Sequence, residues 1–269
     1  MNAIRRRWTP SPLLAASLLL HLAAAGALLL KTALWPWALG AVGANQVLLT
    51  LLGLLPRSHA LGPNWTRLPA VAEAQRAVAL TIDDGPDPAV TSLVLDLLDR
   101  YGAKATFFCI GERALRHPEL CREIVRRGHA VENHSQHHWK HFALLGLGGM
   151  RREIEAANET LTAITGQPPL FFRPTAGLRS PLLDPVLSRC AMHLASWTRR
   201  GFDTRQGHAA TVLATLTCGL AAGDILLLHD GNAARTANGV PVILAVLPPL
   251  LDAIAAADLR PVTLRALLS

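Results

Sequence analysis

Short apolar runs that alternate with longer amphipathic segments constrain the fold of this chain most strongly, and they extend from about residue 77 to residue 264. The strand-like runs are residues 78–82, 106–110, 130–133, 170–173, 193–197, 225–229 and 261–264. The helix-like segments between them include residues 91–101, 118–127, 151–165 and 240–257. Strands that alternate with helices pair in parallel, so the sequence predicts an α/β layer or barrel.

Two adjacent carboxylates end the first of these runs, in the segment Thr-Ile-Asp-Asp-Gly-Pro that contains Asp83 and Asp84. Gly85 and Pro86 force a turn directly afterwards, so both carboxylates lie at the end of a strand. One can bind a cation while its neighbour, which points the other way along the strand, takes a proton from water. The alternative is that the two aspartates only mark the turn.

Two histidines four positions apart, His134 and His138, follow the third strand-like run. Residues at this spacing share one face of a helix or helical turn, so both imidazoles can converge on one ion. A carboxylate would complete a ligand set that keeps a coordination position open, as catalytic metal sites do. His137 and His141 repeat the spacing, which leaves a shifted ligand pair as the alternative. Together with the two aspartates, this pattern is typical of a metal-dependent hydrolase.

Residues 77–264 resemble the polysaccharide deacetylase family, the NodB homology domain of carbohydrate esterase family 4. The family's first motif resembles Thr-Phe-Asp-Asp-Gly-Pro, from which this chain departs only by Ile82. The second motif, His-Ser/Thr-x-x-His, is matched in full. The resemblance implies that Asp83 is the catalytic base. It also implies that Asp84, His134 and His138 bind a divalent metal, with zinc as the default ion.

The third family motif is partly kept in residues 172–177, which retain its Arg-Pro pair and its Gly. Ala176 stands where the family usually has Tyr. The resemblance implies that Arg173 orients the catalytic base. It also implies that the backbone N–H of Thr175 or Ala176 stabilises the oxyanion.

The fourth motif departs further, and its counterpart is residues 197–203. Asp203 stays in register, and Arg200 stands where the family often has an aspartate. A guanidinium suits phosphate or carboxylate, so Arg200 suggests an anionic group on the substrate. Both residues are candidate substrate contacts, and the resemblance implies that an aspartate of this motif pairs with a histidine or an arginine. The fifth motif, Leu-x-His, ends at His229, which the resemblance implies is the general acid that protonates the leaving amine.

Each of these candidate residues belongs to the end of a strand-like run, where parallel barrels place their chemistry. We therefore expect a distorted, incomplete (β/α) barrel of about seven parallel strands, which the resemblance independently implies. The predicted activity is metal-dependent removal of an acetyl or formyl group from an amino sugar, in a glycan or in a lipid-linked saccharide. The alternative, favoured by the altered third and fourth motifs, is a membrane-anchored carbohydrate-binding or regulatory protein without turnover.

Two apolar runs precede this domain, residues 13–30 and 33–55, and each reaches the roughly 20 residues that span a bilayer. A signal peptide is the alternative interpretation of the first. The second run favours an anchor of two helices. Asn45 and Gln46 near its middle favour a helix packed on its neighbour, with a re-entrant segment as the alternative. The predicted division is a transmembrane hairpin over residues 1–57, a linker over 58–76 and a catalytic domain over 77–269.

Cations predict the orientation of this hairpin. Arg5, Arg6 and Arg7 precede it and Arg57 follows it, whereas only Lys31 lies between the two runs. The positive-inside rule therefore places both ends on the cytoplasmic side of a bacterial-type inner membrane. A cytoplasmic domain would meet a lipid-linked amino sugar before its export. The alternative, a periplasmic or extracellular domain, would meet exported glycans.

Composition limits the partners. The net charge of +7 favours anionic membrane lipid or an anionic substrate. The cations are scattered and no nucleic-acid motif accompanies them, so we expect no nucleic-acid partner. The four cysteines show no C-x-x-C spacing, and Cys109 and Cys190 lie in or beside apolar runs. Free buried thiols are therefore expected rather than disulfides.

Overall fold

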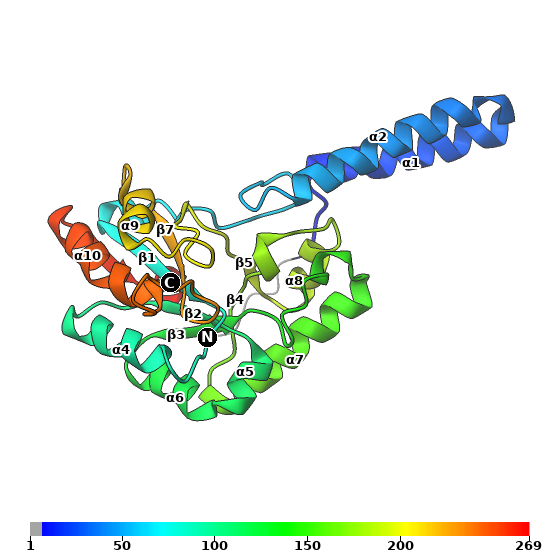
Figure 1. Ribbon diagram of the computed structural model, residues 1–269. Coiled ribbons are helices and arrows are strands. Elements are labelled where there is room, and N and C mark those ends of the chain that lie inside the picture. The colour runs from blue at the N-terminus through cyan, green and yellow to red at the C-terminus, as the bar shows by residue number, and fades with distance from the viewer. Residues whose placement is uncertain (1–6, 269) are drawn as a thin grey trace.

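The computed structural model describes residues 7–268, and within them one sheet of eight strands pairs entirely in parallel (Figure 1). The strand order is β5-β4-β3-β2-β1-β7-β6, and β8 lies beside the start of β1. The strands are β1 Ala77–Asp83, β2 Thr106–Cys109, β3 Ala130–Asn133, β4 Phe171–Phe172, β5 His193–Leu194, β6 Arg199–Arg200, β7 Ile225–His229 and β8 Arg260–Val262. Among the described residues β5 and β6 do not pair, so the barrel is incomplete, as predicted. Arg5 and Arg6 lie outside the described residues.

Helices cover the outer face of the sheet, because most strand-to-strand connections carry one (Figure 1). The helices that follow residue 70 are α3 Val71–Ala74, α4 Thr91–Arg100, α5 Gly111–Arg116, α6 Pro118–Arg126, α7 Leu147–Thr165, α8 Leu183–Arg189, α9 Ala209–Thr217 and α10 Val242–Ala256. Short turns of 3₁₀ helix are η2 Phe142–Leu144, η3 Thr175–Gly177 and η4 Leu264–Leu267. Fully buried side chains such as Leu80, Leu228 and Val246 form the core between sheet and helices.

The two central strands, β1 and β7, position the site. Every residue of both strands is buried, as expected for parallel strands covered on both faces. Their register places Asp83 opposite His229. Two candidate residues more than a hundred positions apart in sequence therefore become neighbours at the carboxyl edge of the sheet.

One predicted strand, residues 193–197, is divided in the structure. Only His193 and Leu194 extend β5, because Ala195 forms an isolated parallel bridge with Trp65. The chain then crosses to the other end of the barrel, where the N–H of Thr198 donates to the carbonyl of Ile225 at 2.8 Å. The short strand β6, which the sequence did not predict, follows from this crossing.

Two helices, α1 Pro12–Leu30 and α2 Trp35–Gly53, project from the barrel side by side (Figure 1). The 3₁₀ turn η1 Thr32–Leu34 joins them into an antiparallel pair. Asn45 Nδ2 donates to Ser17 Oγ at 2.8 Å, and Gln46 Nε2 lies 3.1 Å from His21 Nε2. The polar residues of the second apolar run therefore face the neighbouring helix, as predicted.

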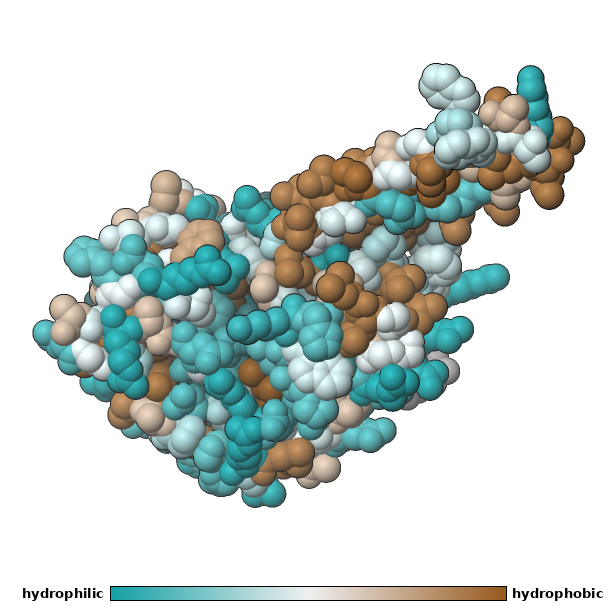
Figure 2. Space-filling model, turned by 45° about the vertical axis from the view of Figure 1, so that its right-hand side comes forward, coloured by the Kyte–Doolittle hydropathy of each residue, from teal (hydrophilic) through white to brown (hydrophobic). Residues whose placement is uncertain are grey.

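Among residues 7–268, α1 is the one helix long and apolar enough to cross a membrane by length and composition. Membrane anchors and signal sequences share this property. Figure 2 shows a largely apolar surface along the projecting pair, where side chains such as Leu22, Leu30 and Trp37 are exposed. The transmembrane hairpin stays a prediction.

Residues 58–76 are not a free linker, which corrects the predicted domain division. Leu61 and Ala72 are fully buried, and the N–H of Leu68 donates to the carbonyl of Gly223 at 2.8 Å. Leu68 and Ala72 belong to the apolar cluster that fills the interior of the barrel. The segment is an integral part of the barrel because its apolar side chains close that interior.

Candidate active site

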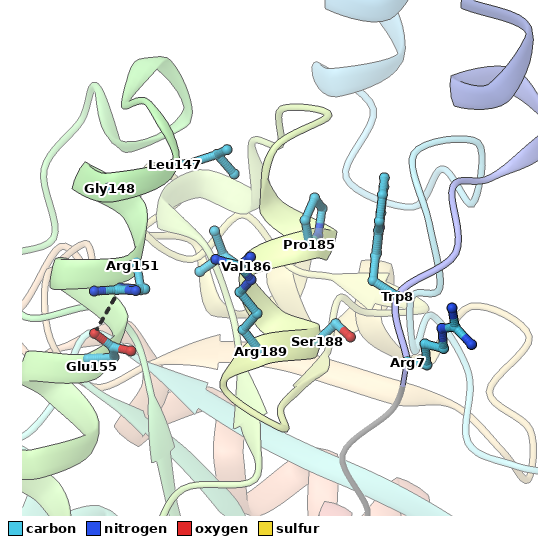
Figure 3. Close-up of a pocket in the computed structure, with 10 residues that line it drawn as sticks. All are labelled: Arg7, Trp8, Leu147, Gly148, Arg151, Glu155, Pro185, Val186, Ser188 and Arg189. Atoms are coloured by element: carbon cyan, nitrogen blue, oxygen red, sulfur yellow. Dashed lines mark ion pairs between the residues drawn. The ribbon is translucent and has the colours of Figure 1, made fainter. Parts of the chain in front are cut away.

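A cavity of about 400 Å³ lies at the carboxyl edge of the sheet. The predicted site residues that line it are Asp83, Asp84, His134, His138, Thr175, Ala176, Arg200 and His229. A larger hollow, of about 980 Å³, lies between the N-terminal segment and helices α7 and α8 (Figure 3). None of the predicted site residues lines that larger hollow, so the predicted site residues that face a cavity all face the smaller one.

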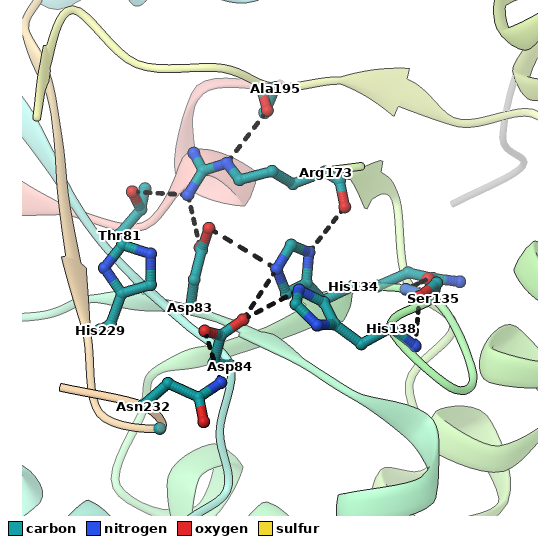
Figure 4. Close-up of polar contacts among 12 residues, drawn as sticks. Thr81, Asp83, Asp84, His134, Ser135, His138, Arg173, Ala195, His229 and Asn232 are labelled. Carbon is teal, nitrogen blue, oxygen red and sulfur yellow. Dashed lines mark hydrogen bonds and ion pairs between the residues drawn. The ribbon is translucent and has the colours of Figure 1, made fainter. Parts of the chain in front are cut away.

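The three predicted metal ligands direct their donor atoms at one another (Figure 4). The Nε2 atoms of His134 and His138 each lie 3.2 Å from Oδ1 of Asp84, and the candidate donor atoms all lie within 4.8 Å of one another. Ligands of a tetrahedral ion with bonds of about 2.0–2.1 Å lie ~3.3 Å apart. The three residues therefore fit a divalent cation that keeps a coordination position for water or substrate.

The two histidines converge through a strained loop rather than through the helical turn that their spacing predicted. Residues 134–138 form an irregular loop after β3, and Ser135 and His138 have positive φ angles of 65° and 54°. Ser135 Oγ accepts a hydrogen bond from the N–H of His138 at 3.0 Å. Asn133 Oδ1 accepts one from the N–H of Ser135 at 2.7 Å. These bonds offset the backbone strain, which concentrates at functional sites.

Burial and neighbouring charges set the protonation of the three ligands. Burial opposes a charge on His134, but Asp83 and Asp84 outweigh it and raise its pKa. Burial, followed by the proximity of His134, lowers the pKa of His138 to about 4. Burial alone would raise the pKa of Asp84, but the neighbouring histidines, led by His134, lower it. At neutral pH His138 is neutral and Asp84 is charged, and metal binding requires the neutral form of His134.

Further contacts orient these ligands. Nδ1 of His134 lies 2.6 Å from the carbonyl oxygen of Arg173, which directs Nε2 towards the other ligands. Asn232 Nδ2 donates to Oδ2 of Asp84 at 3.0 Å, and Arg113 donates to the backbone oxygen of Asp84 at 2.8 Å. The sequence interpretation missed Asn232 and Arg113. Asn232 follows the end of β7, so its position near a strand end could have identified it. Arg113 lies within helix α5, and no motif in the sequence marks it as a site residue.

Asp83 is held by Arg173, whose side chain is only 1% exposed. Nη1 of Arg173 donates to Oδ1 of Asp83 at 2.6 Å. The other guanidinium nitrogens donate to the carbonyl oxygens of Ala195 and Ser196, at 3.1 and 2.7 Å. Oδ2 of Asp83 lies 3.9 Å from Nε2 of His134. One carboxylate oxygen is therefore engaged by the guanidinium, while the other faces the metal ligands.

Asp203 lies behind His229 and does not line the cavity, so it is not in the position of a substrate contact, but it pairs with a histidine as the family's fourth motif implies. Its carboxylate accepts a hydrogen bond from the backbone N–H of His229 at 2.7 Å and lies 2.8 Å from Nδ1 of the ring. Burial opposes a charge on His229, but Asp203 outweighs it, with help from Asp83 and Asp84, and raises its pKa. In Figure 4 the His229 ring lies on the opposite side of Asp83 from His134.

Thr175, Ala176 and Arg200 form one wall of the cavity, as predicted. Thr175 Oγ1 and Arg200 Nε are buried without a hydrogen-bond partner among residues 7–268. The Arg200 guanidinium lies 5.2 Å from the ring of Trp197 and 5.3 Å from that of Phe202. Buried polar atoms without protein partners in a cavity wall are available to a substrate.

His137 and His141, the alternative ligand pair, do not line the cavity. Nδ1 of His137 lies 2.7 Å from Oε1 of Glu153, and its ring stacks on Trp139 at 5.0 Å. The structure therefore brings His134 and His138 to the aspartates, and not the shifted pair.

Comparisons with known proteins agree with this geometry. The polysaccharide deacetylase family model matches residues 70–195. The chain is 32% identical to a peptidoglycan-N-acetylglucosamine deacetylase of Bacillus cereus, covering 67% of this chain and 84% of that protein. It is 30% identical to a chitooligosaccharide deacetylase of Azorhizobium caulinodans, covering 60% of this chain and 77% of that protein. A peptidoglycan-N-acetylmuramic acid deacetylase of Bacillus subtilis is also 30% identical, but this chain spans only 35% of its length.

Solved structures share the fold. A peptidoglycan N-acetylglucosamine deacetylase in complex with 4-naphthalen-1-yl-N-oxidanyl-benzamide gives a TM-score of 0.68 at 25% identity, covering 76% of this chain and 92% of that one. A family 4 carbohydrate esterase from Streptomyces lividans in complex with acetate gives 0.62 at 29% identity, covering 69% and 91%. These structures confirm the incomplete barrel. By its identity to the Bacillus cereus protein over most of that protein's length, the chain belongs to the polysaccharide deacetylase family, the NodB homology domains of carbohydrate esterase family 4.

Proposed function

We propose that this chain is a membrane-anchored, divalent-metal-dependent hydrolase that removes an acetyl or formyl group from the nitrogen of an amino sugar, in a glycan or a lipid-linked saccharide. The observation that carries the proposal is the position of Asp83. It is held by the buried Arg173, lies beside the cluster of Asp84, His134 and His138, and lines the cavity. The deacetylase names of the relatives support an amino-sugar substrate.

Base and acid lie on different strands of this site. A divalent cation held by the two histidines and Asp84, zinc by default, would lower the pKa of water and polarise the acyl carbonyl. Asp83 accepts the proton of the attacking water as the new C–O bond forms, while Arg173 holds its carboxylate in place. The backbone N–H of Thr175 or Ala176 donates to the developing oxyanion.

His229 completes the reaction. Its Nδ1 faces Asp203, so its Nε2 is the atom that gives a proton to the leaving nitrogen as the C–N bond breaks. The products are a free amine on the sugar and acetate or formate. The raised pKa of His229 suits this role, because the acid has to be protonated before the bond breaks.

The test uses Asp83→Asn in the purified full chain, with N-acetylated chitooligosaccharide as substrate and mass spectrometry of the product. We expect loss of turnover with unchanged metal content, because the amide cannot accept the proton of water. Asp252→Asn, on the exposed side of α10, is the matched control and should retain full activity. An Asp83→Asn protein that complements a deletion strain would favour the second candidate, a binding or regulatory protein. The altered motifs that contain Ala176 and Arg200 support this candidate.

The side of the membrane is tested separately, and we propose that the catalytic domain faces the cytoplasm. Cys218 is exposed, whereas Cys109 and Cys121 are buried. A membrane-impermeant maleimide should therefore label Cys218 only after lysis, and Cys218→Ser identifies the labelled site. Labelling in intact cells would place the domain on the outer face and favour exported glycans as substrates.

A further inference from the structure

The catalytic cavity continues into a second hollow of about 530 Å³. Ala176, Trp197 and Arg200 line both, so the two form one continuous groove. The far end of this groove is lined by Leu54 and Arg57. These residues follow the C-terminal end of α2, so the groove runs from the metal ligands to the point where the helical pair leaves the domain.

The chain at this end of the groove is fixed to the rim of the cavity. Ser196 Oγ donates to the carbonyl oxygen of Pro56 at 2.6 Å, and Nη1 of Arg57 donates to that of Thr198 at 3.0 Å. A Cβ atom on Gly177 would lie 2.8 Å from Cβ of Pro56, so that only glycine allows this close approach. The groove therefore has a rigid wall built partly from the segment that follows α2.

Cations face the groove without carboxylate partners. Arg57, Lys140, Arg200 and Arg205 line its two parts, and none forms an ion pair with a carboxylate among residues 7–268. Arg200 lies over the rings of Trp197 and Phe202 at the junction of the two parts, and its Nε is buried with no hydrogen-bond partner among the described residues. The acids that line the cavity, Asp83 and Asp84, are engaged by Arg173 and by the metal-ligand cluster. The charge of the groove is thus complementary to an anion beside the reacting sugar.

Apolar side chains accompany these cations. Leu54 and Phe202 are 53% and 56% exposed, and Leu178 lies half-buried between the two ends. Figure 2 shows that apolar surface continues from the projecting helices onto the adjoining face of the domain. A soluble sugar polymer would leave this apolar wall in water, whereas a lipid chain would cover it.

Ala176 is what joins the two parts. It is exposed, lines both, and stands where a larger residue would fill the junction. Its φ of 56° places the turn in the left-handed region, which side chains other than glycine seldom adopt. Ala176 has no side-chain atom beyond Cβ to occupy the junction, unlike the Tyr of the family's third motif.

We propose that this groove binds the phosphate and the first part of the lipid chain of a polyprenyl-phosphate-linked amino sugar, with Arg200 and Arg57 facing the phosphate. The inference deepens the proposed function and rests on it, because it places the acylated sugar of the same molecule at the metal ligands. It commits the site to a lipid-linked saccharide rather than to a glycan polymer.

A binding experiment tests the groove without turnover. The full chain in nanodiscs, as the Asp83→Asn protein, is exposed to a polyprenyl phosphate with a diazirine next to the phosphate, and cross-links are mapped by mass spectrometry. We expect labelling of residues 54–57, 176–178 and 197–202. Arg57→Gln should lower the yield of cross-linked protein about fivefold, because one charge-assisted contact is lost. Arg122 is an exposed residue of α6, and Arg122→Gln should leave that yield unchanged. Labelling spread along α1 and α2, or displaced by excess phosphatidylglycerol, overturns the proposal.

Turnover of two substrates separates this inference from the proposed function. We expect Arg57→Gln to lower kcat/KM for polyprenyl-phosphate N-acetylglucosamine about fivefold more than it lowers kcat/KM for soluble chitooligosaccharide, because only the first substrate carries the phosphate. Hydrolysis of the soluble sugar without labelling of the groove would reject the groove and keep the hydrolase. Labelling of the groove by a metal-loaded wild-type protein that hydrolyses neither substrate would reject the hydrolase and keep the groove.

Discussion

Asp203 engages both nitrogen donors of His229, the backbone N–H at 2.7 Å and ring Nδ1 at 2.8 Å, from a position with no exposed surface. A carboxylate in this position fixes the orientation of the imidazole and selects the tautomer that carries a proton on Nδ1. It also favours the charged form of the ring. Asp203 is therefore a positioning residue that acts through His229.

Replacing Asp203 by Asn should lower kcat by roughly 10²–10⁴-fold, the contribution of general acid catalysis. Asp203 helps to raise the pKa of His229, and the acid is active only when protonated. Activity therefore falls as the pH rises through that pKa, and removing the carboxylate charge should move this alkaline limb to lower pH. The profile of kcat/KM against pH measures the shift. An alkaline limb that does not move would show that His229 is not the acid.

Removal of the metal should abolish turnover. A chelator is expected to inactivate the purified chain, and a stoichiometric divalent ion should restore it, because the ligand cluster holds one ion. Asn232→Ala, which removes the hydrogen bond to Asp84, should weaken metal affinity by about 10–100-fold. Metal content and the thermal shift on metal addition are the measurements. His137→Ala is the control, and an equal loss of metal there would move the site to the alternative histidine pair.

Arg173→Met should destabilise the fold by about 3–5 kcal/mol, because it leaves the buried carboxylate of Asp83 without its partner. The double variant Arg173→Met with Asp83→Asn should recover part of this loss, since the uncompensated charge is gone. Thermal unfolding of the full chain in detergent compares the three proteins. An Arg173→Met protein as stable as the wild type would mean that the ion pair of Arg173 and Asp83 contributes nothing to the stability of the fold.

Asp230 should make the free energy of unfolding decline as the pH rises from about 4 to about 7. Burial raises its pKa to about 7, although Thr91 donates to it at 2.5 Å and the N–H of Gly231 at 2.9 Å. The unfolded carboxyl titrates near 3.9, so in this window the folded state binds more protons. The free energy of unfolding therefore falls by up to about 1.4 kcal/mol per pH unit as the pH rises.

Asp230→Asn tests this assignment in metal-free protein, where Asp84 carries no ion. The variant should lose this part of the pH dependence even if its absolute stability changes. Equal slopes for the variant and the wild type would assign the effect to another group.

The sequence predicted the parts of the site that motifs and strand ends specify. Asp83 and His229 terminate buried apolar runs, so the pattern places both at the carboxyl edge of a parallel sheet, whereas the pairing of their strands comes from the structure. The path of residues 134–138 could not be predicted, because the positive φ of Ser135 depends on a hydrogen bond to Asn133. Spacing alone suggested a helical turn instead.

Residues 58–76 and Asp203 were misassigned for a related reason. Leu68 and Ala72 fill the barrel interior only because strands distant in sequence leave space there, and local composition does not report such space. The burial of Asp203 behind His229 likewise results from β6 crossing to β7. Contacts of this kind depend on the assembled fold.

Pro56 packs against Gly177, and its carbonyl is bonded to Ser196, so the last turn of α2 and the mouth of the cavity form one rigid piece. If α1 and α2 anchor the chain in a bilayer, as proposed, this piece would hold the catalytic groups at a constant height above the lipid surface. Encounter with a lipid-borne substrate then becomes a search in two dimensions. The rate should follow the number of substrate molecules per unit area of membrane and should fall when detergent dilutes that surface, even at constant bulk concentration.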